Sequence, residues 1–270
     1  MEIAEQTKEK TLEEMSLWYK YKSAAWPKDG PVDQEVTETG KTIHNIERTV
    51  RIFNNPQGFS YLSSPVTTGK IMYGLQREHG ISEKTHPDFR EKILMPAMNQ
   101  NYQSALRFLD AVQKYNLTDK CTILPADLEP SRQRWSQPEF QALWLTMISE
   151  KASEMFMHDD WEYSDGASEE FTHVMQLKLG VPKNSYLAFY NTKEGYEKGL
   201  DRMKNIEVYG LGGDQFGYSK KSISLEDGIE KIEKSVKQIN NWGFQAPKLE
   251  NCLNLLYWTK EKLSEGFYQK

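Results

Sequence analysis

Residues 136–180 read SQPEFQALWLTMISEKASEMFMHDDWEYSDGASEEFTHVMQLKLG and contain the pattern that decides the fold. Ser136 is a helix-capping residue type, and a proline follows in the first turn of the helix that it predicts. Residues 155–157 then form a short apolar run that predicts a strand. A polar loop leads from this strand to Gly166 and to a second predicted helix, which ends at Gly180.

The same alternation extends in both directions from this stretch. Further strands are predicted at Phe59–Ser63, Cys121–Pro125 and Tyr186–Tyr190. Between the first two, residues 101–115 repeat apolar side chains at helical spacing. Strands that alternate with helices indicate a parallel sheet that is covered by helices on both faces. The sequence therefore predicts an α/β protein.

The flanking segments are less regular, and we divide the chain into three parts. Residues 1–57 form an expected N-terminal helical extension, 58–210 the α/β core, and 211–270 an expected C-terminal helical extension. The predicted elements outside the central alternation are helices at Thr11–Tyr21, Ser224–Asn241 and 249–263, a fifth strand at Ile206–Tyr209, and a charge-rich connection over Leu75–Lys92. Ser224 and Asp227 have the spacing of a capping box.

Composition excludes several classes of protein. The 270 residues carry a net charge of −5, which argues against a duplex nucleic-acid binder, since such proteins present a basic face. Two distant cysteines, Cys121 and Cys252, provide neither a disulfide framework nor a zinc knuckle. We expect a cytoplasmic protein without a signal peptide, a membrane span, a cofactor or a metal ion.

The segment Trp161–Glu170 is the strongest candidate for chemistry. In parallel sheets ligands bind beyond the carboxyl ends of the strands, and this segment follows a predicted strand directly. Its small residues allow close approach of a ligand to a helix N-terminus, where backbone amides attract anions. Acidic residues also favour a first helical turn whatever the function, so the pattern alone leaves both interpretations open.

Within this segment, residues Trp161, Ser164, Gly166, Ala167 and Glu170 follow the order W-x-x-S-x-G-A-x-x-E. The pattern resembles the nucleoside 2-deoxyribosyltransferase-like superfamily, which includes the 2'-deoxynucleoside 5'-phosphate N-hydrolases. Residues 61–69, YLSSPVTTG, are similar to a second segment of that family. Tyr61, Ser63, Ser64 and Pro65 are the residues there that the resemblance assigns to the substrate site. It covers roughly residues 59–191.

The resemblance implies a flavodoxin-like three-layer fold and a reaction at an N-glycosidic bond. Glu170 would be the nucleophile at the sugar, with water or another base as acceptor. Ser164 stands where the transferases have Asp and the nucleotide hydrolases have Ser, which favours a nucleoside 5'-monophosphate as substrate. Trp161, Gly166 and Ala167 would frame that substrate. The family completes its pockets across subunits, so the resemblance also implies a homodimer or larger assembly, with Asn191 as a residue that reaches a neighbouring pocket.

One departure from the family concerns a second carboxylate. The family places an Asp on the helix before the third strand, whereas this chain has Trp144, Leu145 and Thr146 in that neighbourhood. Asp159 or Asp160 would have to supply the carboxyl group from the loop. If neither does, the chain is expected to be a nucleotide-binding or scaffold protein that kept the pocket without the reaction.

Four other features have competing interpretations. The residues His158, Asp159 and Asp160 could form a metal site, and a metal-dependent phosphohydrolase is the corresponding function. Adjacent residues seldom bind one ion, however. His173 either hydrogen-bonds Glu170 or is a partly exposed helix residue. Residues 210–214, GLGGD, lack the lysine of a phosphate-binding P-loop and favour a flexible turn. Arg132, Arg134 and Trp135 either hold a phosphate and a base or are solvated.

Overall fold

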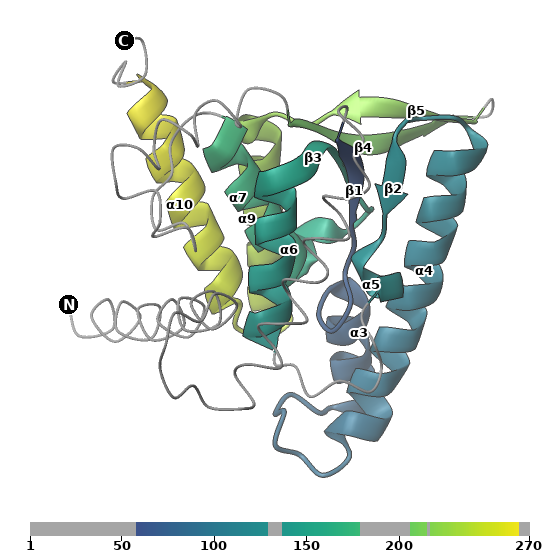
Figure 1. Ribbon diagram of the computed structural model, residues 1–270. Helices are drawn as coiled ribbons and strands as arrows, with labels where there is room; N and C mark the ends of the chain where they lie inside the picture. The colour runs from purple at the N-terminus through teal and green to yellow at the C-terminus, as the bar shows by residue number, and fades with distance from the viewer. Residues whose placement is uncertain (1–57, 129–136, 179–205, 215–216, 265–270) are drawn as a thin grey trace, which may run out of the picture.

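The computed structural model describes residues 58–128, 137–178, 206–214 and 217–264. A five-stranded sheet lies at its centre with the order β2-β1-β3-β4-β5 (Figure 1). The strands are β1 (Phe59–Ser63), β2 (Cys121–Ile123), β3 (Ala152–Met157), β4 (Glu207–Asp214) and β5 (Gly217–Ser222). The first four are parallel and β5 is antiparallel to β4. The predicted α/β class with a flavodoxin-like, three-layer arrangement is confirmed.

Helices cover both faces of this sheet (Figure 1). On one side α4 (Met95–Lys114) packs on Leu62 of β1 and Phe156 of β3. The other side carries α6 (Gln137–Lys151), α7 (Asp165–Lys178), α9 (Leu225–Asn241) and α10 (Pro247–Ser264). The shorter elements are α3 (Lys70–His79), η1 (Arg90–Leu94), α5 (Pro125–Leu128) and η2 (Trp161–Tyr163).

Side-chain alternation along β1 sends its residues to the two layers. Tyr61 belongs to the cluster under α6 and α7, while Leu62 belongs to the cluster under α4. The two-residue period of a strand therefore turns Ser63 to the same face as Tyr61. Both side chains are fully buried. This alternation decides which polar groups of β1 lie beneath α7.

A buried carboxylate joins the central strands on the α4 side. Glu154 of β3 is 3% exposed, and its Oε2 accepts a hydrogen bond from Lys220 Nζ at 2.8 Å. Its Oε1 accepts from Ser60 Oγ at 2.6 Å and from Thr118 Oγ1. Burial alone would raise the pKa of Glu154, but the hydrogen bonds from Lys220, Ser60 and Thr118 hold it below its ordinary value. Side chains from β1, from β5 and from Thr118 before β2 thus compensate the charge of Glu154.

Two expectations about irregular segments were wrong. The charge-rich connection begins as α3, because Met72, Tyr73 and Gln76 form a buried face, and Gly80 ends the helix with φ 65°. Residues 210–214 are not a turn. They belong to β4, since β5 pairs with them and supplies their backbone hydrogen bonds. The C-terminal part therefore adds a strand to the sheet as well as two helices.

Other sequence predictions in the flanks are confirmed or fall outside the described residues. Helix α9 begins with the predicted capping box, in which Ser224 and Asp227 exchange hydrogen bonds, and α10 matches the predicted last helix. The predictions outside the described residues concern Thr11–Tyr21, the cap Ser136, Tyr186–Tyr190, Asn191 and the group Arg132, Arg134 and Trp135. None of the helices in the described part of the chain combines the length and apolar character that a bilayer crossing requires.

Helix α9 approaches α7 closely at a glycine. A Cβ atom built on Gly228 would lie 2.1 Å from Cε1 of Phe171, a fully buried residue of α7. No side chain larger than hydrogen fits there without moving the ring. Gly74 of α3 is the opposite case, because a Cβ at that position meets no atom within 4 Å.

We expect Gly228→Ala to lower the free energy of unfolding by about 3 kcal/mol, because the added methyl group overpacks the core. Gly74→Ala is the matched control and should raise it by about 0.5–1 kcal/mol, since alanine loses less backbone entropy in a helix. Urea unfolding of both variants checks the prediction. Equal stabilities of the two variants would contradict it.

Candidate active site

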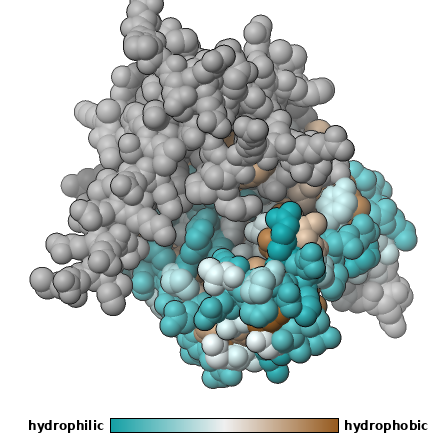
Figure 2. Space-filling model, turned by 90° about the horizontal axis from the view of Figure 1, so that it is seen from below, coloured by the Kyte–Doolittle hydropathy of each residue, from teal (hydrophilic) through white to brown (hydrophobic). Residues whose placement is uncertain are grey.

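A cavity of about 250 Å³ opens at the carboxyl ends of the strands. Its walls come from the segment after β1, from Pro125 after β2, and from the first turns of α6 and α7. This is the edge at which parallel α/β sheets bind ligands. Seen from below, the described surface is mainly hydrophilic with small hydrophobic areas (Figure 2).

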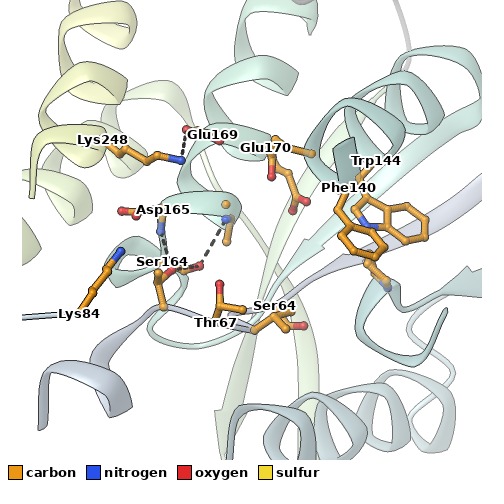
Figure 3. A pocket seen from close by; sticks show the side chains of 16 residues that line it. Ser64, Thr67, Lys84, Phe140, Trp144, Ser164, Asp165, Glu169, Glu170 and Lys248 are labelled. Carbon is orange, nitrogen blue, oxygen red and sulfur yellow. Dashed lines mark hydrogen bonds and ion pairs between the residues drawn. The ribbon is translucent and has the colours of Figure 1, made fainter. Parts of the chain in front are cut away.

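Glu170 of α7 is one of the acidic residues that line this cavity (Figure 3). The residue is 7% exposed. Tyr61 Oη donates a hydrogen bond to Oε1 at 2.6 Å, and Ser63 Oγ donates one to Oε2 at 2.6 Å. Both donors come from the same face of β1. A carboxylate with both oxygen atoms fixed is held in one orientation, as a nucleophile requires.

The start of α7 forms the wall beside Glu170. Ser164 caps the helix, and its Oγ accepts a hydrogen bond from the backbone N–H of Ala167 at 3.5 Å. The hydroxyl of Thr68 accepts from the N–H of Asp165 at 3.1 Å and lies 3.3 Å from Ser164 Oγ. The helix start that the sequence predicted is therefore confirmed, and the segment after β1 holds it in place.

Two aromatic residues of α6 form one side of the cavity. Phe140 and Trp144 are one helical turn apart, and both line it (Figure 3). The ring centroids of Trp144 and Tyr61 are 6.3 Å apart, so the aromatic wall continues to the residue that holds Glu170. Sequence reasoning did not assign these rings to the site. Both rings lie near the start of a helix at the edge of the sheet where ligands bind, and this position could have indicated their role.

Charged residues form another side of the cavity. Lys84 and Lys248 line it together with Asp165 and Glu169 (Figure 3). Lys248 Nζ lies 3.6 Å from Glu169 Oε1. Burial raises the pKa of the Asp165 carboxyl above its ordinary value, whereas the charges of Lys248 and Lys84 act in the opposite direction. Sequence reasoning predicted neither lysine at the site, because both lie outside residues 61–69 and 161–170, the two segments that carry the resemblance.

The structure brings together most of the residues that the resemblance assigned to the site. Ser64, Ser164, Gly166, Ala167 and Glu170 line the cavity, and Tyr61 and Ser63 lie behind Glu170 as its hydrogen-bond donors. Pro65 and Trp161 are buried but are not part of the wall. The ring centroid of Trp161 lies 4.6 Å from that of Phe171, so this tryptophan is a core residue.

The aspartates proposed to replace the missing helix carboxylate are not at the cavity. Asp160 adopts a left-handed turn with φ 61° and pairs with Lys70 at 2.9 Å on the surface. Asp159 is exposed, and neither residue lines the cavity. His158 Nε2 lies 2.9 Å from Ser104 Oγ. Among the described residues, no group of three or more His, Cys, Asp or Glu side chains could hold a metal ion.

His173 lies in the core between α6 and α7 and is not exposed. The side chain is 5% exposed, and Nε2 lies 2.7 Å from Ser149 Oγ of α6. Burial lowers the pKa of His173 from 6.5 to about 4, partly opposed by a backbone hydrogen bond with Leu145. The residue is therefore a neutral core histidine between α6 and α7, and the expectation of a partly exposed position was wrong.

Comparison with models of protein families, with curated protein sequences and with solved structures found no match to this chain.

We expect His173 to make stability depend on pH. Its folded-state pKa lies below its unfolded value, so its contribution is present above pH 6.5 and is lost as the pH falls toward 4. Between pH 7 and 4 the wild type should lose about 3 kcal/mol more unfolding free energy than His173→Gln. Urea unfolding at both pH values measures this difference. Equal losses in the two proteins would contradict the assignment.

Proposed function

We propose that this chain cleaves the N-glycosidic bond of a nucleoside 5'-monophosphate, by hydrolysis or by transfer to another base, with Glu170 as nucleophile. The observation that carries the proposal is the buried Glu170 carboxylate at the cavity wall, with each oxygen atom fixed by a hydroxyl of β1. Burying and orienting a carboxylate in this way suits attack on an electrophilic carbon.

Aromatic, acidic and basic side chains lie in different parts of the cavity. This arrangement supports a substrate that consists of a base, a sugar and a phosphate. In Figure 3, Phe140 and Trp144 lie on one side of Glu170 and the two lysines on the other. Aromatic rings stack on a planar base, and lysine charges with the N-terminus of α7 attract a phosphate. A sugar between these two groups would place its anomeric carbon at Glu170. The motif resemblance at Ser164–Glu170 favours the same substrate.

The proposed reaction follows from this arrangement. A carboxylate oxygen of Glu170 forms a bond to C1' as the C1'–N bond breaks, and the departing base takes the bonding electrons and a proton. In hydrolysis, water then attacks C1', releases the carboxylate and loses its proton. Tyr61 and Ser63 keep the carboxylate oriented through both steps, and the negative charge of Glu170 stabilises positive charge that develops on the sugar.

A second candidate function is nucleotide binding without cleavage. The observation that favours it is Trp144, which lines the cavity from the α6 region where the resembling family carries an Asp. A protein with this arrangement would bind the nucleotide and leave the glycosidic bond intact. No metal-dependent phosphohydrolase is proposed, because His158, Asp159 and Asp160 lie away from the cavity wall.

We expect Glu170→Gln to reduce base release by at least about a thousandfold while nucleotide binding is retained, because the amide keeps the shape but not the nucleophile. Wild type and variant are incubated with deoxynucleoside 5'-monophosphates, and the released base is measured by chromatography. Glu207→Gln is the matched control, since Glu207 is exposed on β4 and pairs with Lys178.

The outcomes separate the two candidates. Near-normal base release by Glu170→Gln would remove Glu170 as the nucleophile. Nucleotide binding by the wild type in a thermal-shift assay, without base release, would replace the enzyme proposal with the binding protein.

A further inference from the structure

Gln141 of α6 brings an unsatisfied hydrogen-bond donor to the cavity wall. Its Nε2 is buried and has no hydrogen-bond partner among the described residues, although the residue lines the cavity. Buried polar groups in native proteins nearly always have a partner, so an orphan in a cavity wall indicates a group that a ligand completes. Ser64 Oγ is a second buried atom of the same wall without a partner in the described chain.

The carboxamide of Gln141 lies next to the start of α7. A Cβ atom built on Gly166 would lie 3.4 Å from Gln141 Oε1, at the distance of an ordinary van der Waals contact. The carboxamide therefore packs beside the Ser164–Glu170 motif.

The surroundings of Gln141 indicate which part of a ligand it meets. Gln141 follows Phe140 directly and precedes Trp144 by three positions, so all three lie on one turn of α6 that faces the cavity. A planar ring that stacks on this aromatic wall presents its edge to a neighbouring amide. A phosphate, in contrast, is attracted to Lys84 and Lys248 more strongly than to a neutral carboxamide.

We propose that Gln141 is a specificity-determining residue whose Nε2 donates a hydrogen bond to a carbonyl oxygen on the edge of the bound nucleobase. The inference rests on the proposed function, since it names the part of the substrate that selects the base. It assigns the site to bases that carry a carbonyl group. A site that offers a buried donor rejects an analogue without the acceptor, because the donor is then left unpaired.

The test measures binding by calorimetry in a Glu170→Gln background, so that turnover does not consume the ligand. The probes are dTMP, dCMP and dGMP, which carry a base carbonyl, and two that do not. These two are dAMP and the 5'-monophosphate of the difluorotoluene deoxynucleoside, which has the shape of thymine. With Gln141 present, at least one carbonyl-bearing nucleotide should bind about tenfold more tightly than both carbonyl-free probes.

Gln141→Met keeps the length of the side chain and removes the donor, so the preference should shrink to within about threefold. Gln176→Met is the matched control. Gln176 of α7 also has a buried Nε2 without a partner in the described chain, but it does not line the cavity. This variant should keep the full preference, even if its stability changes.

Two results would overturn the assignment of Gln141. One is that the Gln141→Met variant still prefers carbonyl-bearing nucleotides. The other is that the protein with Gln141 shows no such preference. If wild-type protein still releases base in that case, the proposed function stands and only this inference fails. If wild-type protein neither binds nucleotides nor releases base, the proposed function fails as well.

Discussion

The structure depends on the need to compensate one buried carboxylate. Glu170 is almost fully enclosed, and an ionised group in such a place must be hydrogen-bonded to persist. The hydroxyls of Tyr61 and Ser63 meet this need, and because they lie two residues apart on β1 they fix both oxygen atoms at once. These two bonds tie α7 to β1 and hold the Glu170 carboxylate at the cavity.

Helix α7 is correspondingly enclosed on nearly every side. Its residues from Glu170 through Leu177 are all buried, between the sheet, α6, α9 and α10. Gly228 permits the close approach of α9, and neutral His173 bridges to Ser149 of α6. Neighbouring acids then take different roles, because successive side chains on a helix point about 100° apart. Glu170 turns to β1 and the cavity, while Glu169 pairs with Lys248.

The C-terminal part of the chain completes the site rather than merely extending the fold. Lys248 of α10 enters the wall of the cavity, and β5 supplies Lys220 to the buried Glu154 of the central strand. The structure thus contains two buried carboxylates with different surroundings. Glu154 is paired with a lysine and serves the packing of the strands, whereas Glu170 is oriented by hydroxyls at a cavity.

Local pattern was sufficient to predict β1 to β3 and the helices α6, α7, α9 and α10, because each depends on side-chain period or capping within a few residues. Glu170 was singled out by the motif that resembles a known family. Residues 210–214 were misread because their glycines favour a turn locally, and only pairing with β5 stabilises them as a strand. The positions of Lys84, Gln141 and Lys248 at one cavity, and of Asp159 and Asp160 away from it, were decided by tertiary packing. These residues are distant along the chain. Side-chain periodicity predicts a helix or strand within one segment, but it does not predict which helices meet at the end of a sheet.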